Sequence, residues 1–225
     1  MAMKKILLGY CLLFTSIFVF SQEGTFLQDI TGKPYMLKKY SKVVEGSAFF
    51  KEQFLRGDVI LNNGYEFKNQ QLKLNLLENL LNYRNDRQQE MISTATVKEV
   101  VLTDSLAGRQ YRFVYSDFLD GSNKPDRGWY EQLYLGKATL LKQYKKELME
   151  KPLYGSASVE LSISTQQRYY IIYAGEWQWV KKIKNLPEIL HIKKNELQKF
   201  IKEQKLNTET EENFIALVHY YNSLQ

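Results

Sequence analysis

The sequence predicts a mainly β protein of the α+β class: an antiparallel meander forming a sandwich or partly open barrel, with two or three amphipathic C-terminal helices. Apolar and polar residues alternate in many short runs, spaced about ten residues apart. Turn-forming residues such as Asn-Gly separate these runs. Near residue 184 the hydrophobic period changes from that of a strand to that of a helix.

The N-terminus has the pattern of a secretory signal peptide. Two lysines precede an apolar run of fifteen residues, Ile6 to Phe20, and Val19 and Ser21 occupy the −3 and −1 positions before Gln22. A transmembrane anchor needs about 20 apolar residues, so this run is short for a span. We therefore expect cleavage after Ser21, export to the periplasm or medium, and no transmembrane span in the processed chain.

Composition limits the classes of partner. The chain has 225 residues and a formal charge of +6, and its single cysteine, Cys11, lies inside the apolar run. The processed chain would therefore form no disulfide bond and would depend on its core. Export makes nucleic acid an unexpected partner, and a mild basic excess is typical of solvated surface lysines.

We divide the chain into four segments. Residues 1–21 are the signal peptide, and residues 22–45 form a loosely structured lead-in with few apolar positions. Residues 46–183 form the antiparallel β domain, and residues 184–225 form a helical segment packed on it.

The leucine-rich stretch after the Asn62-Asn63-Gly64 turn fits two structures. As a helix, Leu72, Leu76 and Leu80 would share one face. As strands, Leu72, Leu74 and Leu76 alternate with polar residues, and a turn at Glu78-Asn79 would lead to a second strand with Leu81 and Tyr83. Turn signals flank the stretch and no capping box opens it, so we favour two strands.

Alternation predicts further strands along the chain. They are 90–93, 97–102, 109–115, 129–135, 138–144, 159–163, 168–173 and 177–183. The charged run 145–153 is left without a regular element. The polar loop 117–128 is the best candidate for a mobile lip.

Helix signals follow in the C-terminal segment. Asn185 precedes Pro187 and Glu188 in the arrangement of an N-cap with proline in the first turn. Thr208 and Glu211 have the spacing of a capping box for the last helix.

The order of these features resembles a known group of proteins. The stretches concerned are Gly-Asp-Val-Ile-Leu, NNGYEFKNQQLKLNLL, GRQYRF, GWYEQLYLGKATLLKQYKKEL and the closing KNELQKFIKEQKLN…EENFIALVHYYNSL. They resemble uncharacterised exported proteins of the Bacteroidetes over most of the processed chain. The resemblance implies a β-rich exported protein and strands in the leucine stretch, and it implies no activity.

Known chemical motifs do not match. Gly136-Lys137 lacks the first glycine and the final Ser or Thr of a phosphate-binding loop. The two histidines, His191 and His219, and scattered carboxylates do not form a ligand pattern, so we expect no metal and no cofactor. A Gly-x-Ser-x-Gly elbow is absent from the sequence.

Two functional hypotheses remain. The first is a non-catalytic envelope protein that binds a small ligand or protein partner through aromatic strand faces and the 117–128 loop. Its candidate binding residues are Trp129, Tyr130, Tyr169, Tyr170, Trp177 and Trp179. The alternative is a periplasmic hydrolase acting on a glycan or lipid, with Asp126 and Glu131 as its acids. The oligomeric state does not follow from the sequence.

The signal peptide gives the first testable prediction. N-terminal mass spectrometry of the exported protein should find Gln22 as the first residue, because the small residues Val19 and Ser21 define the cleavage point. A mature protein that begins elsewhere, or that keeps the apolar run, would refute the processing site.

Overall fold

The computed structural model describes residues 32–35, 43–152 and 159–224; the predicted signal peptide lies outside them. The described strands are β1 (Gly32–Pro34), β2 (Val43–Glu45), β3 (Leu55–Leu61), β4 (Glu66–Asn75), β5 (Leu80–Arg84), β6 (Glu90–Ser93), β7 (Val97–Asp104), β8 (Arg109–Tyr115), β9 (Trp129–Tyr134), β10 (Ala138–Pro152), β11 (Val159–Tyr173) and β12 (Glu176–Val180). The helices are α1 (Leu186–Ile189), α2 (Lys194–Glu203) and α3 (Glu211–Ser223).

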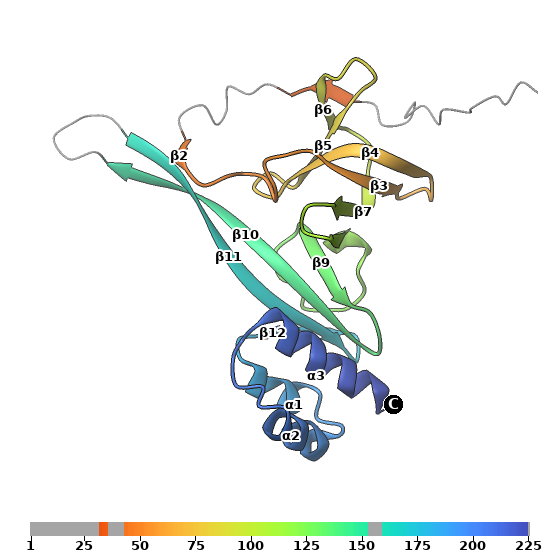
Figure 1. Ribbon diagram of the computed structural model, residues 1–225, viewed down its shortest axis with the longest axis vertical. Coiled ribbons are helices and arrows are strands. Elements are labelled where there is room, and N and C mark those ends of the chain that lie inside the picture. Colours follow the sequence, from red (N-terminus) through yellow and green to blue (C-terminus); the bar gives the residue numbers. More distant parts are fainter. Residues whose placement is uncertain (1–31, 36–42, 153–158, 225) are drawn as a thin grey trace, which may run out of the picture.

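The described strands belong to one open sheet. Its order is β1-β6-β5-β4-β3-β7-β8-β9-β10-β11-β12, and β2 pairs with β11 outside this path. Neighbours along the path are antiparallel, whereas β2 lies parallel to β11. The predicted mainly β fold with C-terminal helices is confirmed, and the strands form a single sheet rather than the two facing sheets of a sandwich (Figure 1).

The leucine-rich stretch forms strands β4 and β5, as predicted. Leu72 pairs with Tyr83 and Leu74 with Leu81 across the hairpin. Asn79 adopts a φ of 58° in the connecting turn, a left-handed conformation that asparagine tolerates better than most residues. The leucines at alternate positions of β4 are buried, so the period-two pattern reflects a core-facing strand.

One face of β3–β9 builds the largest core. Its buried members are Leu55, Val59, Leu61, Phe67, Leu72, Leu74, Leu76, Leu81, Tyr83, Val97, Val100, Leu102, Tyr111, Phe113 and Trp129. The Phe50 ring packs edge-on against Tyr111, Phe113 and Tyr144. This contact carries the core across from β8 to β10.

Strands β10 and β11 are longer than the sequence predicts. They pair without interruption from Ala138↔Tyr173 to Pro152↔Val159. The run 145–152 therefore continues β10, and the two predicted strands 159–163 and 168–173 are one. The prediction was wrong because both faces of the β10–β11 pair are partly exposed. Charged residues therefore replace the alternating pattern that marks a half-buried strand.

The helices pack against the end of the sheet at β9 and β10. Phe214, Leu217, Val218 and Tyr221 of α3 are buried with Ala138, Leu140 and Ile171 of the hairpin and with Leu197 of α2. At the C-terminal end of α3, the Asn222 side chain exchanges hydrogen bonds with the backbone of Ala138, at 3.1 and 3.0 Å. The amide thus completes the backbone pairing where β10 begins.

The predicted helix caps need correction. Helix α3 is capped by Thr210, whose Oγ1 accepts from the backbone N–H of Asn213 at 3.4 Å, rather than by Thr208. Thr208 instead accepts from the Asn213 side chain. Asn185 precedes α1 but forms no side-chain cap, because its own backbone is already helical.

Residues 43–50 connect the β10–β11 pair with strand β4. Within the predicted lead-in, β2 pairs with Leu161 and Ser162 of β11. A few residues later, the N–H of Phe50 donates to the carbonyl of Leu74 at 2.8 Å. Gly46 lies between these contacts with a φ of +81°, and a Cβ there would lie 2.0 Å from the carbonyl oxygen of Ile163.

Gly46 gives a matched pair of variants with Gly64, whose φ is +87° but whose side-chain position is open space. Gly64→Ala should lower the free energy of unfolding by about 1 kcal/mol through backbone strain alone. Gly46→Ala should lower it by about 3 kcal/mol, because the added methyl group also displaces the Ile163 carbonyl. Urea unfolding monitored by tryptophan fluorescence measures both. Equal midpoints for the two variants would contradict this close packing of β2 on β11.

Candidate functional site

The 117–128 loop, predicted as a mobile lip, is bonded to the edge of β12. The Trp177 indole N–H donates to the carbonyl of Asp120 at 2.8 Å. Ser122 forms a parallel bridge with Glu176, and its backbone bonds to Gly175 and Trp177. The loop therefore covers this stretch of sheet edge.

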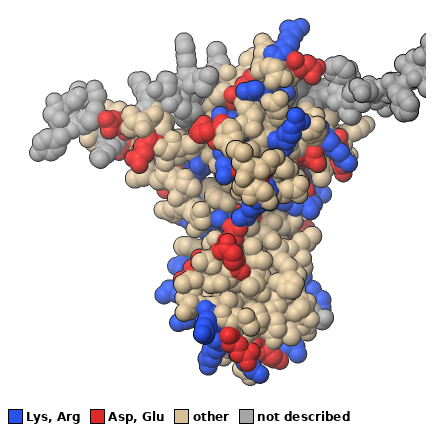
Figure 2. Space-filling view, in the orientation of Figure 1, with Lys and Arg blue, Asp and Glu red and all other residues tan. Residues whose placement is uncertain are grey.

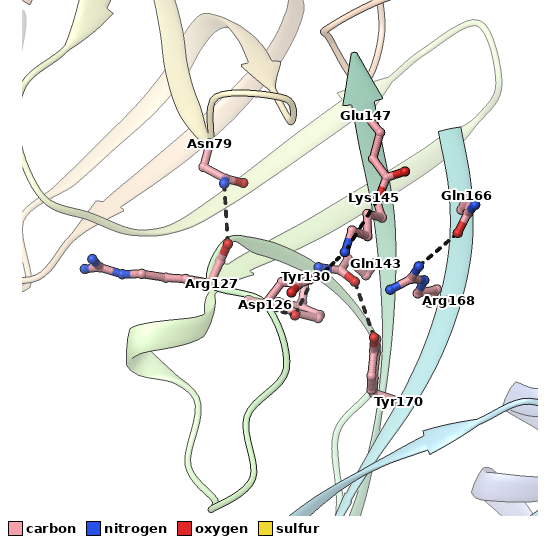
Figure 3. A network of polar contacts seen from close by, with 10 residues as sticks. All are labelled: Asn79, Asp126, Arg127, Tyr130, Gln143, Lys145, Glu147, Gln166, Arg168 and Tyr170. Carbon is pink, nitrogen blue, oxygen red and sulfur yellow. Dashed lines mark hydrogen bonds and ion pairs between the residues drawn. The ribbon is translucent and has the colours of Figure 1, made fainter. Parts of the chain in front are cut away.

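A small pocket opens where β9 begins beside β10. Strand β9 pairs with β10 at Leu140–Lys142, so the next residues of β10 lie beyond their β9 partner. The β4–β5 turn and residues 126–129 close this space to a cavity of about 140 Å³. Its lining residues are Leu76, Leu77, Asn79, Asp126, Arg127, Trp129, Gln143, Tyr144, Lys145 and Lys146. Figure 3 shows five of these residues, Asn79, Asp126, Arg127, Gln143 and Lys145.

Two carboxylates neutralise two of the cations at this pocket. Lys145 Nζ lies 2.6 Å from Asp126 Oδ2, and this hydrogen bond raises the pKa of Lys145. Arg127 pairs with Asp117 and turns its guanidinium away from Lys145 (Figure 3). Lys145 and Arg127 therefore each have a carboxylate counter-charge.

Lys146, the third cation that lines this pocket, has only neutral hydrogen-bond partners among the described residues. Its Nζ donates to the backbone carbonyl of Ser47 at 2.8 Å and to Thr165 Oγ1 at 3.2 Å, both neutral oxygens. Among the described residues it forms no ion pair with a carboxylate. Burial lowers the pKa of Lys146, because the ammonium loses water without gaining a counter-charge; the more distant Glu52 offsets this in part.

A bridge of hydrogen bonds holds the wall of the pocket. The Gln143 amide donates to the Tyr130 hydroxyl at 3.1 Å and accepts from the Tyr170 hydroxyl at 3.5 Å (Figure 3). The Tyr130 hydroxyl in turn donates to the carbonyl of Asp126 at 2.6 Å. Burial is the main cause that raises the pKa of Tyr130, so this hydroxyl stays a donor at neutral pH.

Trp129 closes the core side of the pocket with an unused donor. Its side chain is buried, and its indole N–H has no hydrogen-bond partner in the described structure. An unsatisfied buried donor costs about 1–3 kcal/mol.

The structure separates the six predicted aromatic binding residues. Four of them are buried and offer little surface to a partner: Trp129, Tyr130, Tyr170 and Trp177. Of these, Trp129 lines the pocket, and Tyr130 and Tyr170 support its wall through Gln143. Tyr169 is partly buried against Phe214, and burial raises its pKa to about 12. Trp179 is 48% exposed and its ring is flanked by Arg168 and Lys181.

The two predicted acids do not share a cavity. Asp126 lies at the Lys145 side of the small pocket, whereas Glu131 lines a second cavity beside α3. Glu131 accepts from Arg109 and from the Tyr144 hydroxyl, each at 2.7 Å. It belongs to a charge cluster, which we define as Arg109, Glu131, Lys142, Tyr144 and Glu211.

The charge cluster fastens α3 to the sheet. Arg109 Nη2 donates to both Glu131 and Glu211, and Lys142 Nζ lies 2.7 Å from the second oxygen of Glu211. Burial raises the pKa of Glu131 despite its hydrogen bonds. Burial also acts to raise the pKa of Glu211, but Lys142 and Arg109 outweigh it, so the net pKa is lowered.

Sequence reasoning missed Gln143, Lys145 and Lys146. They lie in or next to a charged run that carries no catalytic motif. Their significance comes from partners distant in sequence, such as Ser47 and Tyr170, which only the folded sheet brings close.

Comparison with protein-family models, with curated protein sequences and with solved structures finds no match for the chain. Among the described residues, no group of three or more His, Cys, Asp or Glu side chains has an arrangement that could hold a metal ion. None of the described helices is long and apolar enough to cross a bilayer. Functional inference therefore depends on the geometry of the pocket.

Glu211 offers a pH-dependent test of the charge cluster. A lowered native pKa means that Glu211 contributes stability above its unfolded pKa of about 4.3, and that this contribution is lost as the pH falls toward the native pKa. Glu211→Gln should lower the free energy of unfolding by about 2 kcal/mol at pH 7. The difference from wild type should shrink below about pH 4.

The neighbouring Glu212, which is exposed, provides the control. Glu212→Gln should change the free energy of unfolding by less than about 0.5 kcal/mol. Chemical denaturation at several pH values measures both variants. A Glu211→Gln effect that is the same at pH 7 and pH 3.5 would show that the charges of the cluster do not stabilise α3.

Proposed function

We propose that the protein is a non-catalytic binding module of the cell envelope, and that its small pocket holds an acidic group of its ligand. Lys146 carries this proposal, because its half-buried ammonium hydrogen-bonds only neutral oxygens among the described residues. A carboxylate, sulfate or phosphate oxygen in the pocket would supply the missing counter-charge. Export after signal cleavage belongs to the same proposal and rests on the N-terminal sequence pattern.

Three features of the pocket support a binding role. Its volume of about 140 Å³ suits a small group rather than a whole polymer unit. Trp129 lines the pocket with a buried indole N–H that has no hydrogen-bond partner among the described residues, so a ligand in the pocket would change its surroundings. The Gln143 bridge between two tyrosines fixes one wall in place, so the site is formed before a ligand arrives.

The alternative of a glycan or lipid hydrolase stays a prediction from sequence. A pair of catalytic carboxylates must flank one scissile bond. Asp126 is ion-paired with Lys145 and lines one cavity, and Glu131 is hydrogen-bonded to Arg109 and Tyr144 beside another. This arrangement gives the predicted pair no common substrate position.

Nitrogen-15 NMR of the tryptophan indoles tests the pocket directly, since the chain has three tryptophans. Titration with sodium sulfate, and separately with sodium glucuronate, at constant ionic strength should shift the Trp129 indole signal saturably. The Trp177 signal serves as reference, because its indole N–H is already bonded to Asp120. Lys146→Gln should abolish the Trp129 shift.

Lys98→Gln is the matched control. Lys98 is an exposed cation on β7 that does not line the pocket, so its removal should leave the Trp129 titration unchanged. Sodium chloride alone should produce no saturable shift. If Lys146→Gln titrates like wild type, or if chloride reproduces the effect, the pocket is not an acidic-group site.

A further inference from the structure

The helical end of the molecule carries a groove with an apolar floor and a basic rim. The groove has a volume of about 640 Å³. Pro187, Ile201 and Leu206 form its apolar part, and Lys184, Lys202 and Lys205 line its edge with Gln198 and Asn207. The apolar residues come from α1, α2 and the segment after α2, so the groove is built into the packing of this end.

Lysines are concentrated around this groove. Residues 181–207 contain eight lysines and three glutamates. All three glutamates are engaged: Glu196 with Lys193, Glu188 with Lys194, and Glu203 with Lys199. The lysines without a carboxylate partner among the described residues are Lys181, Lys182, Lys184, Lys202 and Lys205.

The position of this end favours contact with an extended surface. Helices α1 and α2 lie at one extreme of the long axis of the molecule, away from β1–β6 (Figure 1). The lower part of Figure 2 shows basic side chains at this end, with acidic side chains between them. In the α1–α2 connection, Ile192 is 48% exposed. An exposed apolar residue at a helical end rich in lysine is a pattern typical of helices that lie on anionic membranes.

We propose that the α1–α2 end docks onto an anionic lipid bilayer surface. The three groove lysines contact lipid phosphates, and the exposed Ile192 side chain enters the boundary between the headgroups and the acyl chains. Charge complementarity selects this occupant, since five of the eight lysines in residues 181–207 have no carboxylate partner among the described residues. This surface is separate from the ligand pocket, because the groove and the pocket have no lining residue in common.

Vesicle flotation tests the proposal with the processed chain that begins at Gln22. The probes are vesicles of phosphatidylcholine alone and vesicles containing three parts phosphatidylcholine to one part phosphatidylglycerol. The protein should float with the anionic vesicles at 0.1 M salt, remain unbound with neutral vesicles, and dissociate as salt rises. The triple variant K184Q/K202Q/K205Q should bind about 100-fold more weakly.

The control variant K33Q/K98Q/K137Q removes the same charge from exposed strand and turn positions. It should keep binding within about threefold of wild type, and Ile192→Ser should weaken binding without changing the salt dependence. Circular dichroism confirms that each variant is folded. Equal losses in the two triple variants would overturn the proposal in favour of net charge alone. Binding to soluble polyglutamate but not to anionic vesicles would also overturn it and assign the surface to an acidic polypeptide.

Discussion

The antiparallel ladder between β10 and β11 is the constraint on which the other parts of the molecule depend. It runs unbroken from Ala138↔Tyr173 to Pro152↔Val159. Strand β9 joins it on one side, β12 and β2 join it on the other, and α3 packs against its first residues. Because β9, β12, β2 and α3 all contact this strand pair, its register determines where the pocket beside β9 lies and which surface the helices pack against.

Polar groups of β10 show how the ladder connects structure with function. Lys142 is paired with Glu211 and so helps to hold α3. Four residues later, Lys146 lies beyond the β9 partner and meets the neutral oxygens of Ser47 and Thr165. The two lysines share a strand and a face but have opposite electrostatic surroundings. The carboxylate of Glu211 offsets the desolvation of Lys142, whereas the half-buried Lys146 has no such partner among the described residues and is the basis of the proposed anion site.

The sequence predicts the parts of the fold that are half-buried and locally encoded. Alternating leucines and the Asn-Gly turn identify β3–β5, because each strand buries one face and the turn needs positive φ. Alternation fails for Glu147–Glu150, where side chains on both faces of β10 are exposed. Aromatic residues were predicted as a binding surface, but Tyr130 and Trp177 are core residues that support other groups. Lys146 has no local signal, since its environment is made by residues 47 and 165.

The proposed acidic-group site depends most directly on the charge state of Lys146. Carbon-13 NMR of the lysine side chains, with Lys146→Arg to assign the signal, measures the pKa of this ammonium with and without sodium sulfate. We expect a pKa below the ordinary lysine value of about 10.4 in the free protein, and an increase when sulfate is bound. An ordinary pKa that sulfate leaves unchanged would contradict the assignment of this pocket to an acidic group.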